Sequence, residues 1–166
     1  MAGRSTRSLG FMSGRVRPRI GDVIEIETPK GKAYAHYTHR HTRYGALLRV
    51  LPGITNVAPT DFARLVEQSP QFMTFFPLGA ACARRLVRIV ANEAVPDSAK
   101  AFPIFRSGAR NLATGKVANW WLWDGEKEWK VGRLSPGMET MPLRGVWNDT
   151  MLIKRIVDGW RHEHEA

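Results

Sequence analysis

The segment that most constrains the fold is an alternating run near the start of the chain, Val23-Ile24-Glu25-Ile26-Glu27-Thr28. Side chains alternate along a strand, so its two isoleucines share one face and its two glutamates share the other. This period of two predicts a half-buried β-strand whose glutamate side faces solvent. The turn sequence Pro29-Lys30-Gly31-Lys32 follows, in which proline fixes one φ angle and glycine permits a positive one. We therefore expect a β-hairpin whose second strand covers residues 33–43.

A second hairpin is predicted by aromatic residues around an Asp-Gly turn. The run Trp120-Trp121-Leu122-Trp123 precedes Asp124-Gly125, and a partner strand follows around residues 129–132. Asp-Gly between two alternating aromatic segments is a strong local hairpin signal. Alternation places Trp121 and Trp123 on one face and the other two side chains on the opposite face. Both faces are apolar, so both must be covered, either by the protein's own core or by a partner.

The remaining elements are bounded by proline, glycine or helix-capping residues. Strands are predicted over residues 46–51, 71–76 and 86–91, and short helices near residues 60 and 77. A C-terminal amphipathic helix is capped by Asn148-Asp149-Thr150 and repeats apolar residues at Leu152, Ile156 and Trp160. The predicted fold is one α+β domain over residues 20–166, with six to eight mainly antiparallel strands in a curved sheet and two or three short helices.

Length and charge limit the class of protein. A chain of 166 residues with 43% hydrophobic residues fits one domain. It has 25 Lys+Arg and 15 Asp+Glu, which gives a net charge of +10. Residues 1–20 contain five arginines and no acid, so half of this charge belongs to what we expect to be a flexible basic tail over residues 1–19.

Motifs for catalysis and membrane insertion are missing from the sequence. The single cysteine, Cys82, has no adjacent base to activate it and cannot form an internal disulfide, which favours a buried thiol in a reducing, cytoplasmic setting. No nucleophile elbow, phosphate-binding loop or paired-carboxylate motif occurs. The longest uncharged stretch, residues 68–83, is shorter than the about 20 residues that span a bilayer. We expect no enzymatic activity, no catalytic residue, no cofactor and no membrane association.

Histidines on the first hairpin suggest a metal site that is incomplete. His39 and His41 lie on the same face of the predicted strand, and such a pair can supply two nitrogen ligands to zinc. A third ligand is missing, and Arg40 and Arg43 would oppose a cation. We therefore favour a polar strand face and predict no metal. His162-Glu163-His164 is expected to be a solvated chain end.

Cations and aromatic residues alternate along the first hairpin. Contact with phosphates and stacked bases uses this combination, and so does a protein interface that faces an acidic partner. A solvated strand edge protected by charge is the third alternative. The candidate partner-binding residues are Lys30, Lys32, Tyr34, His36, Tyr37, His39, Arg40, His41, Arg43 and Tyr44 of the hairpin, together with Trp121 and Trp123 as anchor or core.

The order of several motifs resembles the immunity protein 26 family of bacterial polymorphic toxin systems. The resemblance rests on Ile20-Gly21-Asp22-Val23-Ile24-Glu25-Ile26, the Pro/Gly/Lys turn with Ala33-Tyr34-Ala35-His36, Arg84-Arg85-Leu86-Val87-Arg88-Ile89-Val90, and Ala101-Phe102-Pro103-Ile104-Phe105. It spans about residues 16–160. It implies a mainly β, non-enzymatic, cytoplasmic protein that neutralises a cognate toxin by binding it, with no catalytic residues.

Two functional hypotheses follow. The first is an immunity-type or defence-associated binding protein that recognises a protein partner through the basic and aromatic hairpin. An inhibitor of a basic nuclease is expected to be acidic, so the charge of +10 favours an acidic partner or a role other than nuclease inhibition. The alternative is a nucleic-acid-binding domain that uses the arginine-rich tail and the hairpin.

Overall fold

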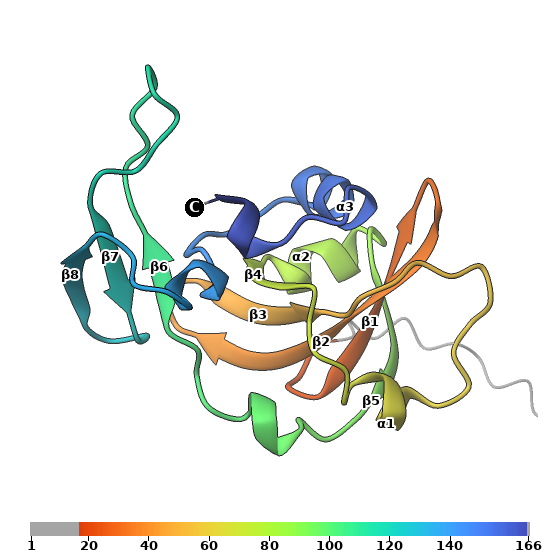
Figure 1. Ribbon diagram of the computed structural model, residues 1–166. Helices are drawn as coiled ribbons and strands as arrows, with labels where there is room; N and C mark the ends of the chain where they lie inside the picture. The colour runs from red at the N-terminus through yellow and green to blue at the C-terminus, as the bar shows by residue number, and fades with distance from the viewer. Residues whose placement is uncertain (1–16, 166) are drawn as a thin grey trace, which may run out of the picture.

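A five-stranded antiparallel sheet in the order β4-β3-β2-β1-β5 forms the core of the computed structural model, which describes residues 17–165 (Figure 1). Its strands are β1 (Asp22–Thr28), β2 (Gly31–His41), β3 (Gly45–Val50), β4 (Phe72–Phe76) and β5 (Arg88–Asn92). The predicted first hairpin is confirmed: only Pro29-Lys30 separates β1 from β2, and Gly31 takes a φ of +133°. Near the other end of β2, a bulge shifts the register between Tyr37 and His39.

A three-stranded antiparallel sheet packs against one end of the larger one (Figure 1). It consists of β6 (Phe105–Ser107), β7 (Trp120–Trp123) and β8 (Glu128–Gly132). The predicted Asp-Gly hairpin is confirmed, because the Asp124 carboxylate accepts the backbone N–H groups of Glu126 and Lys127 at 2.9 and 2.8 Å. The connection between β6 and β7 projects away from both sheets (Figure 1).

Three short α-helices complete the fold: α1 (Phe62–Leu65), α2 (Leu78–Ala83) and α3 (Asp149–Val157). Three 3₁₀ turns accompany them, η1 (Asp97–Ala99), η2 (Met138–Thr140) and η3 (His162–Glu165). The predicted cap of α3 is confirmed, since the Asn148 side chain accepts the Met151 N–H at 2.8 Å. The protein is therefore an α+β fold with a mainly antiparallel sheet and a C-terminal amphipathic helix.

The two faces of the five-stranded sheet are both covered. Helices α2 and α3 pack on one face, and α1 and η1 lie on the other (Figure 1). The predicted solvent-facing glutamate side of the first hairpin is wrong for Glu25, which is only 5% exposed. The cause is the segment that carries α1, because Phe62 and Val66 pack over Val23 and Tyr34 on that face.

Two further expectations concern the chain as a whole. None of the helices within residues 17–165 is long and apolar enough to cross a bilayer. Of the basic tail predicted for residues 1–19, residues 1–16 lie outside the described residues.

Candidate functional site

The cations predicted to bind a partner lie at two separate ends of the first hairpin. Lys30 and Lys32 lie at the β1–β2 turn, whereas Arg40 and Arg43 lie at the β2–β3 turn (residues 40–45). Arg40 lies eight positions after Lys32 along β2, which corresponds to roughly 25 Å. The hairpin therefore cannot present these four cations as one continuous surface.

The residues between these ends are buried, which corrects their assignment to the partner surface. Tyr34, His36 and Tyr37 are 3%, 0% and 5% exposed. The Tyr34 hydroxyl donates to Glu25 at 3.1 Å, and Tyr37 belongs to the core cluster to which α2 and α3 contribute. Each of these side chains is committed to the interior, because the covering segments described above reach across both faces of β2.

His36 links β2 to two neighbouring segments: Gly21, which immediately precedes β1, and Glu93, which immediately follows β5. Its Nε2 lies 3.1 Å from the Gly21 carbonyl oxygen and 3.0 Å from that of Glu93. Since both partners are acceptors, Nε2 carries the proton. Burial holds the pKa of His36 below its ordinary value, so the ring stays neutral and structural.

The β2–β3 turn is held in place by His41. Its Nδ1 accepts the backbone N–H groups of Arg43 and Tyr44 at 3.1 and 3.3 Å, and its Nε2 donates to the Gly125 carbonyl at 2.9 Å. The Tyr44 ring stacks on Phe75 at 5.3 Å between centroids. One histidine therefore fixes the turn and ties it to the β7–β8 hairpin.

Arg40 and Arg43 project from this fixed turn. Both side chains are exposed, and within residues 17–165 neither has a carboxylate within 4.0 Å. Trp123 is 6% exposed and belongs to the aromatic cluster behind the turn, which removes it from the candidate surface. Trp121 is 38% exposed and pairs with Lys130 on β8, so it remains available.

His39, the other histidine considered as a metal ligand, is also bonded to backbone. Its Nε2 donates to the Lys100 carbonyl at 2.8 Å, and its Nδ1 accepts the Thr38 hydroxyl at 2.9 Å. Over the described part of the chain, no group of three His, Cys, Asp or Glu side chains is placed to hold a metal ion. His39 and His41 instead join β2 to the segments that cross it.

The expectation of a solvated chain end at His162 is wrong. This side chain is 4% exposed, its Nδ1 accepts the Leu143 N–H at 3.1 Å, and its Nε2 donates to the Met73 carbonyl at 3.1 Å. Burial, aided by the nearby charges of Arg106 and Arg155, lowers the pKa of His162 to about 4. The neutral ring therefore joins η3 to the edge of β4.

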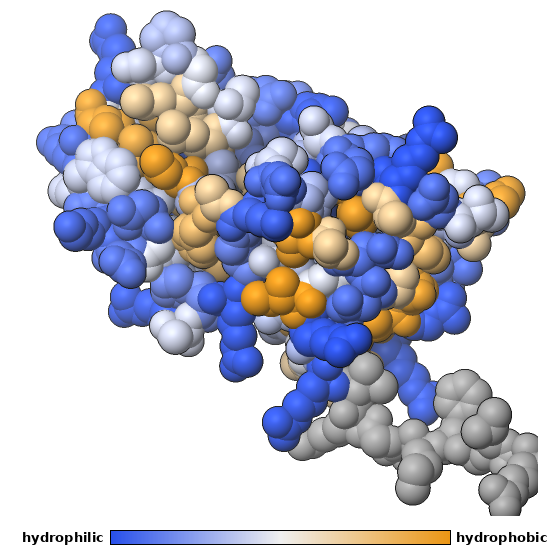
Figure 2. Space-filling model, turned by 90° about the horizontal axis from the view of Figure 1, so that it is seen from below, coloured by the Kyte–Doolittle hydropathy of each residue, from blue (hydrophilic) through white to orange (hydrophobic). Residues whose placement is uncertain are grey.

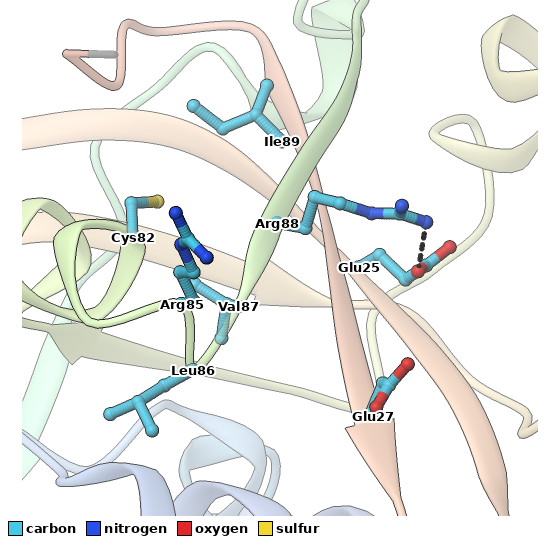
Figure 3. Close-up of a pocket in the computed structure, with 8 residues that line it drawn as sticks. All are labelled: Glu25, Glu27, Cys82, Arg85, Leu86, Val87, Arg88 and Ile89. Carbon is cyan, nitrogen blue, oxygen red and sulfur yellow. Dashed lines mark hydrogen bonds and ion pairs between the residues drawn. The ribbon is translucent and has the colours of Figure 1, made fainter. Parts of the chain in front are cut away.

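A pocket of about 560 Å³ lies between β1, β5 and the end of α2 (Figure 3). Glu25 faces this pocket and accepts an Arg88 N–H at 2.7 Å, with the Lys32 ammonium 3.4 Å away. Burial alone would raise the pKa of Glu25, but the hydrogen bonds from Tyr34 and Arg88 and the two positive charges outweigh it and lower the pKa. Glu25 is an ionised acceptor whose partners are already in place.

Sequence reasoning did not select Glu25, although a signal existed. The two-residue turn between β1 and β2 sets a register that places Glu25 directly opposite Tyr34. Lys32 precedes Tyr34 by two positions and so lies on the same face of β2. A glutamate opposite a tyrosine and diagonal to a lysine is a recognisable cross-strand group. What the alternation could not show was that another segment buries this face.

The opposite wall of the pocket carries Cys82 and Arg85 (Figure 3). Arg85 has a φ of +58°, and the Leu86 N–H donates to the Ala81 carbonyl at 2.9 Å, which closes the C-terminus of α2. Cys82 is half-buried, and burial raises the pKa of its thiol. No described histidine lines the pocket, and its carboxylates, Glu25 and Glu27, come from β1 on the side opposite Cys82 (Figure 3), so the arrangement supplies an ion pair rather than an activated nucleophile.

Comparison of the chain with protein-family models, curated proteins and solved structures finds no match. The geometry of residues 17–165 therefore carries the functional inference. The resemblance to the immunity protein 26 family stays a prediction.

Proposed function

We propose that this protein is a non-catalytic binding domain that recognises an acidic surface of a protein partner with its β2–β3 turn. The observation that carries the proposal is the pair of exposed arginines, Arg40 and Arg43, on a turn that His41 and Tyr44 hold rigid. Neither arginine is neutralised by a carboxylate within the described residues.

A rigid cationic turn has physical advantages as a recognition element. Binding costs less when the contacting loop is already ordered, because less conformational entropy is lost. Arginine is enriched among residues that dominate interface energies, and its fork-shaped guanidinium matches a carboxylate. Unpaired cations also accelerate the encounter with an acidic partner. Exposed Trp121 on β7 offers apolar surface on the second sheet.

The partner that we propose is a cognate toxin of acidic character, and the location is the cytoplasm. This part rests on the resemblance to the immunity protein 26 family and on the positive charge. The separation of the two cationic ends of the hairpin supports a local protein contact over a continuous phosphate-binding track, which is why nucleic acid is the alternative rather than the first choice.

The test begins with the product of the neighbouring gene, co-expressed with the full chain and captured by affinity purification. The double variant Arg40→Glu/Arg43→Glu should lose the complex, with binding weakened at least about a hundredfold by calorimetry. The matched control Arg64→Glu/Arg161→Glu reverses two exposed arginines elsewhere, neither of which has a carboxylate within 4.0 Å among the described residues, and should bind normally. Unchanged binding by the first variant would exclude the β2–β3 turn as the contact.

A salt titration separates the alternative. A nucleic-acid-binding domain should shift DNA or RNA at low salt and lose affinity steeply toward physiological salt, because phosphate contacts release counterions. We expect no shift of either nucleic acid at 50 mM salt. If the wild type shifts nucleic acid and Arg40→Glu/Arg43→Glu abolishes that shift, the β2–β3 turn binds nucleic acid and the alternative replaces the first proposal.

A further inference from the structure

A second pocket, of about 330 Å³, lies on the face of the five-stranded sheet that carries α1 and η1. Strands β2, β3 and β4 supply one wall, and residues 67–70 and 98–103 supply the other. Met73 and Phe102 contribute apolar surface to it. On this side of the molecule, hydrophilic residues cover most of the surface and hydrophobic residues appear in separate groups (Figure 2).

Arg49 brings a buried positive charge to this pocket. It is 5% exposed, and its two terminal nitrogens donate to the carbonyl oxygens of Val66 and Gln68, each at 3.0 Å. Over residues 17–165 no carboxylate lies within 4.0 Å of it. A guanidinium group has five N–H donors, so two bonds leave capacity for a further acceptor. Buried cations are ordinarily paired, and the remaining donors of Arg49 suit an anionic acceptor.

The remaining polar groups of the pocket are the His39 ring, three hydroxyls and one acid at its edge. The His39 ring and the Thr38 hydroxyl are already bonded, to each other and, for His39, to the Lys100 carbonyl. The Ser69 and Ser98 hydroxyls line the pocket and form no hydrogen bond with any described residue. Glu67 is exposed and attracts Arg49 from beyond ion-pair distance. One buried cation and two free hydroxyls suit a small anion, and the negative edge favours a charge of −1, because Glu67 repels a doubly charged anion about twice as strongly as a singly charged one.

We propose that this pocket binds a carboxylate group through Arg49, Ser69 and Ser98. A carboxylate is planar and matches the guanidinium fork, and the apolar wall of Met73 and Phe102 accommodates a short aliphatic chain. The carboxylate can come from an acidic side chain of the protein partner or from a free short-chain acid. The first source rests on the proposed function, whereas the second does not.

An NMR titration of the full chain with small probes tests the pocket without any partner. The probes are N-acetyl-glutamate N-methylamide, its glutamine counterpart, butyrate and inorganic phosphate. We expect the glutamate probe to shift the amide signals of Thr38, Arg49 and Phe102 saturably, with a dissociation constant on the order of 1–10 mM, and the glutamine probe to shift none. Tighter binding of the glutamate probe than of butyrate identifies a side chain as the source, and the reverse identifies a free acid. Tighter binding of phosphate than of both, or no saturable shift at these amides, overturns the proposal.

Variants locate the bound group. Arg49→Met should weaken the glutamate probe at least about tenfold, and Ser69→Ala/Ser98→Ala, which changes only exposed side chains, about threefold. Arg64→Met removes a nearby exposed arginine outside the pocket and should leave binding unchanged. Wild-type affinity in both test variants would overturn the assignment. Failure here leaves the β2–β3 turn untouched, because the turn is tested by partner binding of Arg40→Glu/Arg43→Glu.

Discussion

Arg49 and Arg106 are both buried without a carboxylate within 4.0 Å among the described residues, yet their guanidinium groups are satisfied very differently. Arg106 on β6 is 0% exposed, lies under the Trp120 ring at 4.7 Å, and donates to four carbonyl oxygens. These acceptors belong to Met141, Glu139, His162 and Glu165. Arg49 has two carbonyl partners and lines a pocket.

The number of bonds separates the two roles. The four acceptors of Arg106 lie 33 to 59 residues away in sequence, so this side chain joins β6 to η2 and η3 and uses four of its five N–H donors. Arg49 holds the segment at the end of α1 and has N–H donors left for a further acceptor. A buried arginine can therefore be a structural link or a candidate binding group, and the count of its acceptors distinguishes the two.

The largest effect should come from Arg106→Met. It leaves four buried carbonyl oxygens without their donor and removes the cation under Trp120, so we expect a loss of about 4 kcal/mol in the free energy of unfolding, measured by urea denaturation. Arg110→Met is the matched control, because Arg110 is half-exposed and, among residues 17–165, its ion-pair partner is Glu165 alone. A loss below about 1 kcal/mol for Arg106→Met would show that the four bonds do not make it a structural link.

The second prediction concerns His162, which lies beside Arg106. Its pKa is about 4 in the folded protein, against an ordinary value of 6.5. Between pH 4 and pH 6.5, His162 is therefore protonated in the unfolded chain and neutral in the folded protein. The stability that depends on the neutral ring is complete above about pH 6.5 and falls as the pH approaches 4, by about 3 kcal/mol in total. Urea denaturation at pH 7 and pH 4.5 should show most of this difference in the wild type. In His162→Gln only the loss due to His36, whose pKa is lowered as well, should remain.

A matched control for this pH effect is His164→Gln, which changes an exposed histidine two residues away. It should lose stability with falling pH as the wild type does. If His162→Gln also behaves as the wild type, the buried ring at η3 is not the group that titrates.

The third prediction is a smaller loss at Arg49. Arg49→Met should lower the free energy of unfolding by about 1–2 kcal/mol, because only two carbonyls lose a donor and the adjoining pocket admits water to them. Urea denaturation under the same conditions as for Arg106→Met gives the comparison directly. Equal losses for the two variants would remove the distinction between them.

The sequence predicted those elements whose causes are local. Alternation and the Pro-Lys-Gly-Lys turn predicted the first hairpin, Asp124-Gly125 predicted the second, and the Asn148 cap with its apolar repeat predicted α3. Each depends on residues within about ten positions of one another. The α+β fold with a mainly antiparallel sheet followed from them.

The candidate site could be predicted only in part, because its decisive contacts are distant in sequence. Arg40 and Arg43, selected as partner-binding residues, are exposed, but Tyr34 and His36, selected with them, are buried. Their burial depends on Phe62 and on the Glu93 carbonyl, 28 and 57 residues farther along the chain. For the same reason, Arg106 was not selected. Its charge is typical of a surface residue, and the carbonyl oxygens that accept its hydrogen bonds are distant in sequence.

The smallest effect on stability should come from Glu67→Gln, which changes the edge of the Arg49 pocket. Glu67 is exposed and beyond 4.0 Å from Arg49, so we expect the free energy of unfolding to change by less than about 0.5 kcal/mol. Binding of N-acetyl-glutamate N-methylamide should instead tighten about twofold to threefold. The substitution removes a negative charge that repels the probe, and the positive charge of Arg49 is unchanged. The NMR titration measures this change, and Glu163→Gln, an exposed acid that does not line the pocket, is the control. Weaker binding after Glu67→Gln would mean that Glu67 helps to hold the ligand, and Arg49 would then lack the spare capacity that separates it from Arg106.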